Sequence, residues 1–245
     1  MQILHEIGKY FLMLRRMVAR PEKLSMYWKE TIRQMNDIGV GSLTIIAMIS
    51  VFIGAVTAIQ FAYQLGNSFI PEYYTGYIVR DMMLIELAPT FSSLVLAGKV
   101  GSNIASELGS MRSTEQIDAL EIMGVNTISY LVAPKILAAV FIVPFLVIIS
   151  AALGIIGGMV ATTNLGIPFE VYYKGLIFWF EPFNVTLMLI KGIVFPFIFS
   201  SVACFYGYYV KGGALEIGAA STKAVVNSSI IILIADFLIA KLLLS

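Results

Sequence analysis

Long apolar stretches are the feature that most restricts what this sequence can fold into. A helix needs about 20 mostly apolar residues to cross the roughly 30 Å hydrocarbon core of a bilayer. Five stretches of the sequence meet this requirement, and they cover residues 43–65, 82–104, 131–161, 185–208 and 228–244. We therefore predict an all-α integral membrane protein with five transmembrane helices.

The composition supports the bilayer as the environment of this chain. Of the 245 residues, 59% are hydrophobic and 13% are charged, whereas about a quarter of the residues in a soluble domain are charged. The net charge of +1 gives no electrostatic reason to expect nucleic acid as a partner. The single cysteine, Cys204, excludes an internal disulfide. Charged residues interrupt the first 18 positions, so we expect no cleavable signal peptide.

Lysine and arginine are distributed unevenly between the loops that join the predicted spans. Cytoplasmic segments keep positive charge, and translocated segments lose it. The segment before the first span carries Lys9, Arg15, Arg16, Arg20, Lys23, Lys29 and Arg33. The next loop carries only Arg80, and the loop after it carries Lys99, Arg112 and Lys135. This alternation predicts a cytoplasmic amino terminus and a periplasmic carboxy terminus.

The first eighteen residues have the pattern of an amphipathic helix. Apolar residues near one face are Ile3, Ile7, Leu14 and Met17. Such a helix can lie along the cytoplasmic leaflet with its basic side chains near lipid phosphates. It can equally pack on the membrane domain, and the two arrangements are compatible. We therefore expect one membrane domain over residues 1–245, in which residues 1–41 form a cytoplasmic or interfacial helical segment.

A polar segment between the second and third spans predicts a short cytoplasmic helix. Ser113 and Gln116 have the spacing of a capping box, which would open a helix there. The apolar face would carry Ile117, Leu120 and Met123, and the acidic face Glu115, Asp118 and Glu121. This periodicity fits a solvated loop helix or a docking helix for a cytoplasmic partner.

Three charged residues lie inside predicted spans. Burying a charge in the bilayer costs several kcal/mol, so such residues are usually paired or functional. Glu86, Lys191 and Asp236 come from the second, fourth and fifth spans, and they can form one mixed-charge cluster. They would either brace the helices or supply polarity on the path of a lipid headgroup. Gln60, near the external end of the first span, is a further candidate for that path.

Glycine and proline residues suggest where the spans pack closely and where they bend. Close helix approach is expected at Gly98 and Gly101 and at Gly154, Gly157 and Gly158. Proline inside a span can kink the helix and free a backbone carbonyl. The prolines in this position are Pro89, Pro144 and Pro196.

Residues 86–124 carry the most specific pattern in the sequence, reading ELAPTFSSLVLAGKVGSNIASELGSMRSTEQIDALEIMG. This stretch resembles the signature of the MlaE-type permeases, the membrane subunits of ABC lipid transporters in diderm bacteria and chloroplast envelopes. Its matching positions include ELAP at 86–89 and the run from Thr114 to Leu120. Further similarity includes Lys191, the stretch 219–229 and Asp236. One departure is Ile85, where similar proteins often have arginine.

The resemblance implies a homodimeric permease with an amino-terminal interfacial helix and five spans in each subunit. Residues 105–124 would be the coupling helix region, which docks on a separate ATPase. The coupling residues implied are Glu107, Leu108, Gly109, Met111 and Arg112, and Gly109 would permit a tight turn. The substrate path implied is Gln60, Glu86, Lys191 and Asp236.

The resemblance also implies partners and a location. A cytoplasmic ABC ATPase dimer would use ATP and Mg, and this chain would bind neither. A periplasmic hexamer of MCE domains would exchange phospholipid with the permease in the bacterial inner membrane. Some members of the family also have a small cytoplasmic STAS-domain subunit.

The residues themselves offer no catalytic constellation. His5 is the only histidine, which excludes a histidine-based triad or a multi-histidine metal site, and a Walker loop is absent. We therefore expect a permease subunit that is not an enzyme. Two other hypotheses are an ion-coupled secondary transporter that uses Glu86, Lys191 and Asp236 as a relay, and an intramembrane hydrolase that uses Glu86 and Asp236.

Overall fold

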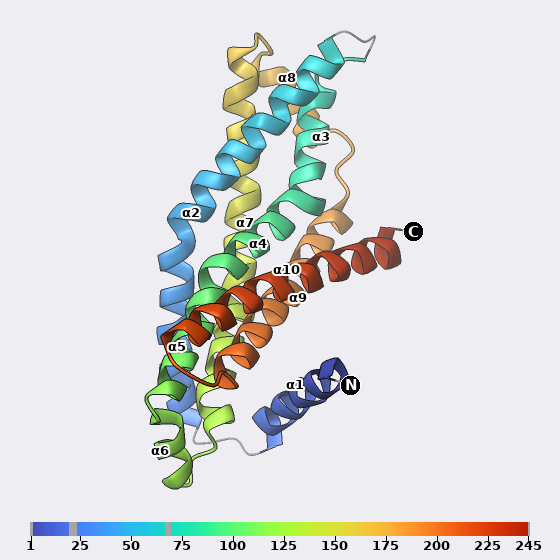
Figure 1. Cartoon of the computed structure of the whole chain (residues 1–245). Coiled ribbons are helices and arrows are strands. Elements are labelled where there is room, and N and C mark those ends of the chain that lie inside the picture. The colour runs from blue at the N-terminus through green and yellow to red at the C-terminus, as the bar shows by residue number, and fades with distance from the viewer. Residues whose placement is uncertain (1, 20–23, 67–69, 245) are drawn as a thin grey trace. The chain divides into compact units, whose positions relative to one another are not determined.

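The computed structural model describes residues 2–19, 24–66 and 70–244, and these are almost entirely helical (Figure 1). The α-helices are α1 (Gln2–Ala19), α2 (Leu24–Gly66), α3 (Tyr74–Met82), α4 (Ser92–Leu96), α5 (Ser102–Ser113), α6 (Gln116–Ile122), α7 (Ala133–Asn164), α8 (Phe169–Ile177), α9 (Pro182–Tyr208) and α10 (Ala214–Leu244). The predicted charges Arg20 and Lys23 and the side chain of Ile3 lie outside what the structure describes.

Among the described residues, five helices are long and apolar enough to cross a membrane, which confirms the predicted number of spans. They cover Tyr27–Gly66, Tyr74–Ser113, Ile128–Asn164, Pro182–Tyr208 and Ala214–Leu243. Each overlaps one predicted stretch, but four are clearly longer than predicted. Apolar composition identifies only the part of a helix that lies in hydrocarbon, and the backbone hydrogen bonds continue through the polar residues beyond it.

The second span departs from α-helical geometry in two places. Residues Met83–Phe91 and Ala97–Gly101 form π-helix, and a third π segment, Ile128–Val132, precedes α7. Pro89 lies inside the first of these segments. Proline has no N–H to donate and clashes with the carbonyl four residues before it, so the wider π turn accommodates it. Pro144 and Pro196, by contrast, lie inside continuous α-helix.

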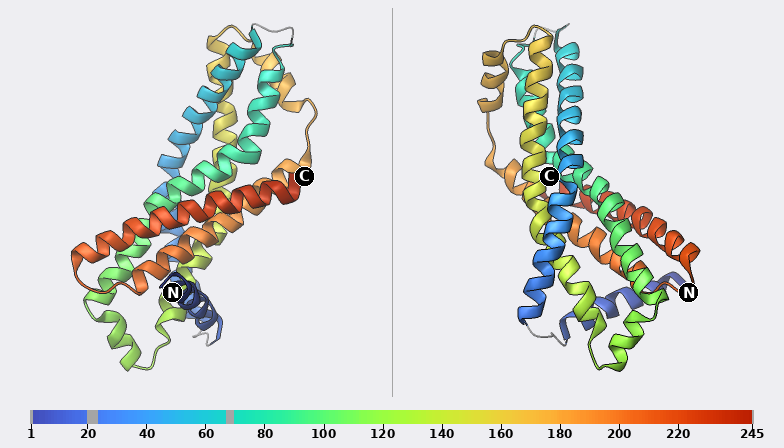
Figure 2. Two further views of the ribbon diagram at one scale, coloured as in Figure 1. Left: turned by 45° about the vertical axis from the view of Figure 1, so that its right-hand side comes forward. Right: turned by 90° about the vertical axis from the view of Figure 1, so that its left-hand side faces the viewer.

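The chain divides into two compact units, which are described separately here. The first contains Met1–Gly41, Leu96–Ile142 and Val194–Ala235, and the second contains Ser42–Val95, Val143–Ile193 and Asp236–Ser245. Within the first unit, the short connection at residues 209–213 joins the end of α9 to the start of α10 (Figure 2).

In the first unit, α1 packs against the end of α9. The Tyr10 hydroxyl lies 2.7 Å from Ser201 Oγ, and the Tyr10 ring meets Phe205 edge to face at 5.8 Å. Met13 is fully buried, while Phe11 on another side of α1 is 63% exposed. The predicted packing of the amino-terminal helix on the membrane domain is therefore confirmed, and its exposed apolar side chains fit an interfacial position.

In the second unit, glycines bring α2 and α7 into backbone contact. A Cβ on Gly54 would overlap the backbone of Gly154, and one on Gly157 would overlap that of Val51. Close approach at Gly154, Gly157 and Gly158 is thus confirmed. The prediction is wrong for Gly98, where a Cβ would meet nothing within 4 Å, because this side of its helix has no close neighbour.

We predict that Gly157→Ala destabilises the protein, because its methyl group has no room against the α2 backbone. Overpacking of this kind costs about 1–3 kcal/mol. Thermal unfolding of the purified chain in detergent measures the effect, and Gly98→Ala is the matched control. A Gly157→Ala variant that unfolds at the same temperature as Gly98→Ala would contradict this packing.

Candidate functional site

Lys191 on α9 stands at the centre of a buried charge cluster in the second unit. Its side chain is fully buried, and Nζ lies 2.7 Å from Glu86 Oε2 and 2.5 Å from Asp236 Oδ1. The three charged residues predicted from separate spans are therefore in direct contact. One ammonium group faces two carboxylates, and this pairing reduces the cost of burying it.

A backbone carbonyl completes the environment of Lys191. The Lys191 ammonium donates a hydrogen bond of 2.9 Å to the carbonyl oxygen of Ile85. In an α-helix this carbonyl would accept from the N–H of residue 89, but Pro89 has no N–H. Pro89 therefore cannot make the α-helical bond to the carbonyl that Lys191 uses. Lys191 donates hydrogen bonds to Glu86 and to Ile85, and Asp236 adds a close ion pair.

The two carboxylates of the cluster differ in exposure. The side chain of Glu86 is 42% exposed, and that of Asp236 is 12% exposed. The other Glu86 oxygen, Oε1, accepts a bond of 3.3 Å from Thr90 Oγ1. An incoming anion could reach Lys191 only by displacing one of its present partners, and Glu86 is the accessible one. Gln60 is exposed on α2 and is not among the partners of Lys191.

The capping box predicted at Ser113 and Gln116 is not formed between α5 and α6. Ser113 is the last residue of α5, and α6 begins at Gln116 after Glu115, whose φ is 58°. No side-chain hydrogen bond caps α6 at Glu115. The box is absent because α5 continues through Ser113. The predicted turn at Gly109 is also wrong, since Gly109 lies inside α5 and the chain turns at Glu115.

The predicted coupling residues on α5 mainly face the interior of the first unit. Leu108 is fully buried, and a Cβ on Gly109 would lie 3.1 Å from the Ile217 side chain. Glu107 Oε2 lies 2.6 Å from Nζ of Lys135, which is 3% exposed. Met111 is half-buried. These contacts hold α5 against the rest of the first unit.

Arg112 joins α5 to α6. Its guanidinium lies 2.7 Å from Asp118 Oδ1 and 3.9 Å from Glu121 Oε1, and 5.9 Å from the centre of the Tyr208 ring. The Tyr208 hydroxyl lies 2.9 Å from Glu121 Oε1 and 2.7 Å from the hydroxyl of Thr127. The acidic face predicted for this helix is thus partly neutralised by ion pairs. Sequence periodicity missed these partners because they come from other helices.

The far end of α6 exposes apolar side chains. Ile117 is fully buried as predicted, but Ile122 is 87% exposed and Met123 is 68% exposed. Met123 therefore does not share the buried face, because α6 ends at Ile122 and the chain turns. We call Ile122 and Met123 the α6 tip. Among the described residues, no group of three or more His, Cys, Asp or Glu side chains could hold a metal ion.

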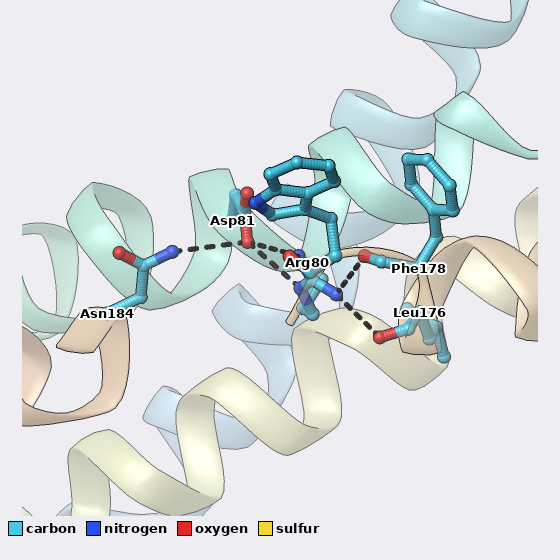
Figure 3. Close-up of polar contacts among 6 residues, drawn as sticks. Arg80, Asp81, Leu176, Phe178 and Asn184 are labelled. Atoms are coloured by element: carbon cyan, nitrogen blue, oxygen red, sulfur yellow. Dashed lines mark hydrogen bonds and ion pairs between the residues drawn. The ribbon is translucent and has the colours of Figure 1, made fainter. Parts of the chain in front are cut away.

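Arg80 on α3 is a structural residue whose role the sequence did not reveal. It is 3% exposed and donates hydrogen bonds to the carbonyl oxygens of Leu176, Phe178 and Trp179 at 2.7, 2.9 and 3.1 Å (Figure 3). Its guanidinium also pairs with Asp81 Oδ1 at 2.8 Å. We call this arrangement the Arg80 clamp. It fixes the connection between α8 and α9, in which Trp179 has a φ of 45°.

We predict that Arg80→Lys loosens this connection, because a lysine cannot span three carbonyls and a carboxylate at once. The chain has two tryptophans, so Trp28→Phe leaves Trp179 as the only indole. Trp179 is already 72% exposed, so the readout is its mobility: in that background, Arg80→Lys should lower the fluorescence anisotropy of Trp179, because the loop is held less firmly. Lys174→Arg, on the neighbouring α8, is the control. Equal anisotropy in both variants would show that the clamp does not hold the loop.

Comparisons with known proteins agree with this architecture. The family model described as Permease MlaE matches residues 31–242. A protein of Rickettsia bellii named probable ABC transporter permease protein is 38% identical over 98% of this chain and 93% of its own. The chloroplastic protein TRIGALACTOSYLDIACYLGLYCEROL 1 of Arabidopsis thaliana is 31% identical over 91% of this chain and 64% of its own.

A further relative carries a more specific description. The intermembrane phospholipid transport system permease protein MlaE of Haemophilus influenzae is 30% identical over 95% of this chain and 89% of its own. The family model covers more than four fifths of the sequence, including the charge cluster and the α5–α6 segment. The chain therefore belongs to the MlaE family of ABC transporter permeases.

Proposed function

We propose that this chain is the membrane subunit of an ATP-driven transporter that moves phospholipids between the inner membrane and a periplasmic MCE-domain partner. Membership of the family supports the permease role, and the description of the Haemophilus influenzae relative supports phospholipid as the substrate. The observation that carries the proposal is the Lys191 cluster, since a buried cation paired with a partly exposed carboxylate suits a headgroup path.

The proposed chemistry at this cluster is an exchange of anions. A lipid phosphate that approaches along the Glu86 side would compete with the Glu86 carboxylate for Lys191, while Asp236 and the Ile85 carbonyl keep their bonds. Phosphate is a strong acceptor for a charged donor, so the exchange need not leave the ammonium group unpaired. Gln60 is proposed to contribute a polar contact farther along the path.

A second copy of the chain is the proposed partner in the membrane. In the most apolar stretch of α10 only 11% of the residues are buried, compared with 67% in α9. Exposed apolar side chains there include Ile230, Leu233, Ile234 and Phe237. Lipid alone could cover this face, but a homodimer around α10 would also place two substrate paths around one axis.

The cytoplasmic partner in this proposal is an ABC ATPase dimer, which would use ATP and Mg. Residues 105–124 would be its docking region within a single permease domain over residues 1–245. Glu107, Leu108, Gly109, Met111 and Arg112 would hold the region rigid, and the α6 tip would insert into the ATPase. The ATPase would contact the tip differently in its two conformations, and each of these would then favour a different conformation of the permease. A STAS-domain subunit is a further proposed partner.

The proposed orientation follows the charge distribution. It places the amino terminus and residues 1–41 at the cytoplasmic face and the carboxy terminus in the periplasm, as expected when basic residues remain inside. The multi-pass architecture of five apolar helices is compatible with this arrangement.

We predict that Lys191→Ala abolishes lipid transport and also lowers stability, by about 3–5 kcal/mol, because it leaves two facing carboxylates without their cation. It is compared with the triple variant Lys191→Ala, Glu86→Gln, Asp236→Asn, which removes all three charges together. ATP-dependent loss of a fluorescent phospholipid from proteoliposomes measures transport, and thermal unfolding measures stability. If the cluster lies on the path, the triple variant recovers stability without recovering transport. Recovery of both would assign the cluster a bracing role only.

We predict that Ile122→Ser and Met123→Ser together weaken capture of the ATPase, because each removes apolar area that the partner would bury. Loss of one such contact is worth about 1.5 kcal/mol or more, which corresponds to at least about tenfold in affinity. Ile177→Ser, also an exposed apolar residue at 60%, is the control. Co-purification with mass spectrometry and the ATPase rate of the complex measure the outcome.

The two outcomes of that experiment point to different classes of protein. A co-purifying ATPase that is lost only in the tip variant supports the ABC mechanism. A chain that purifies alone, transports lipid or ions without ATP, and loses transport in Lys191→Ala would instead support an ion-coupled transporter with Glu86, Lys191 and Asp236 as its relay.

A further inference from the structure

A cavity of about 320 Å³ opens in the first unit between α1, the end of α9 and the start of α10. All of its lining residues belong to that unit. Helix α9 ends at Tyr208 and α10 begins at Ala214. The cavity therefore lies where two candidate membrane spans are joined, next to a helix with exposed apolar side chains, and the proposed orientation puts this connection at the cytoplasmic membrane surface.

Three lysines from three different elements surround this cavity. Lys9 comes from α1, Lys211 from the connection between α9 and α10, and Lys223 from α10. Within the described part of the chain, none of the three ammonium groups has a carboxylate oxygen within 4.0 Å. Their charges are therefore available to a ligand, in contrast to the paired ammonium groups of Lys135 and Lys191.

Two carboxylates also line the cavity, but they do not cancel this charge. Glu216 Oε2 accepts a hydrogen bond of 3.0 Å from the backbone N–H of Gly213, at the amino-terminal end of α10. A carboxylate in that position is already stabilised by the first turn of its helix. Glu6 lies one turn from Lys9 on α1. The site thus keeps an excess of positive charge and suits an anion.

The deeper wall of the cavity is apolar and aromatic. Phe205 is 8% exposed and Ala220 is 9% exposed, and both line the cavity. The hydroxyl of Tyr206 accepts a hydrogen bond of 2.6 Å from Asn227 Nδ2, which ties α9 to α10. Burial raises the pKa of the Tyr209 phenol, so this group stays a neutral hydrogen-bond donor at the mouth. The wall is fixed by contacts that exist without any ligand.

This combination of features selects one class of ligand. A cationic rim binds phosphate, and an apolar wall at the membrane surface accepts the glycerol and upper acyl region of a lipid. We propose that this cavity binds the phosphate headgroup of an anionic membrane phospholipid, which bridges α1 to the connection between α9 and α10. The inference goes beyond the proposed transport function, because it concerns residues other than those of the Lys191 cluster and assigns them to a lipid that holds α1 in place.

The experiment measures binding to the purified full-length chain in mild detergent, so it needs no ATPase. Dioctanoyl phosphatidylglycerol is titrated and counted by native mass spectrometry, with dioctanoyl phosphatidylcholine as the zwitterionic comparison. We expect saturable binding of phosphatidylglycerol that is at least about tenfold weaker in Lys211→Gln/Lys223→Gln, since each lysine supplies a charge-assisted contact. Lys241→Gln, elsewhere on α10, should bind like the unaltered chain.

Two further measurements distinguish a lipid phosphate from a soluble phosphate, and a loss of binding from a loss of folding. Inorganic phosphate at the same concentration should not displace the lipid, and displacement would assign the site to a soluble phosphate instead. Lys211→Arg/Lys223→Arg keeps both charges and should bind within about threefold of the unaltered chain. Equal affinity for the two lipids, or equal binding by the glutamine variant, would overturn the proposal.

Discussion

A lysine ammonium group buried among membrane-spanning helices must find all of its partners within the protein, and the second unit is organised around this requirement. Lys191 donates hydrogen bonds to Glu86 and to the carbonyl of Ile85, and it forms a close ion pair with Asp236. Glu86 and Ile85 belong to the second span and Asp236 to the fifth, so the single cation on the fourth span ties these three spans together. In hydrocarbon, where no water can take over a lost bond, such a network fixes the register of the helices as well as their contact.

The Ile85 carbonyl connects this requirement to the backbone. Pro89 prevents its α-helical bond, and the span takes the π-helical geometry at the same place. A local defect in one helix therefore coincides with a hydrogen-bond acceptor for a charge on another. The same proline was predicted to free a carbonyl, but its recipient could not be predicted because Lys191 lies more than a hundred residues away.

The sequence predicted the spans and the charge cluster well because hydrocarbon imposes a simple rule on each. Long apolar runs must cross the membrane, and isolated charges within them must meet. It predicted the α5–α6 segment less well. There the residues Arg112, Glu121, Tyr208 and Lys135 find partners on other helices, and neither helical periodicity nor a capping motif contains that information. The π segments were missed for a similar reason, since no residue pattern in a short window distinguishes a wider turn from a kink.

The Arg80 clamp forms its hydrogen bonds to the connection between α8 and α9 only through main-chain oxygens (Figure 3), and its guanidinium also lies 5.5 Å from the centre of the Phe180 ring. A guanidinium that holds peptide carbonyls is indifferent to the side chains that project from them. The hydrogen bonds of the clamp would therefore survive a change of side chain at residues 176 and 179, whereas a change at Phe178 would also remove its ring contacts with Tyr73, Tyr74 and Tyr77.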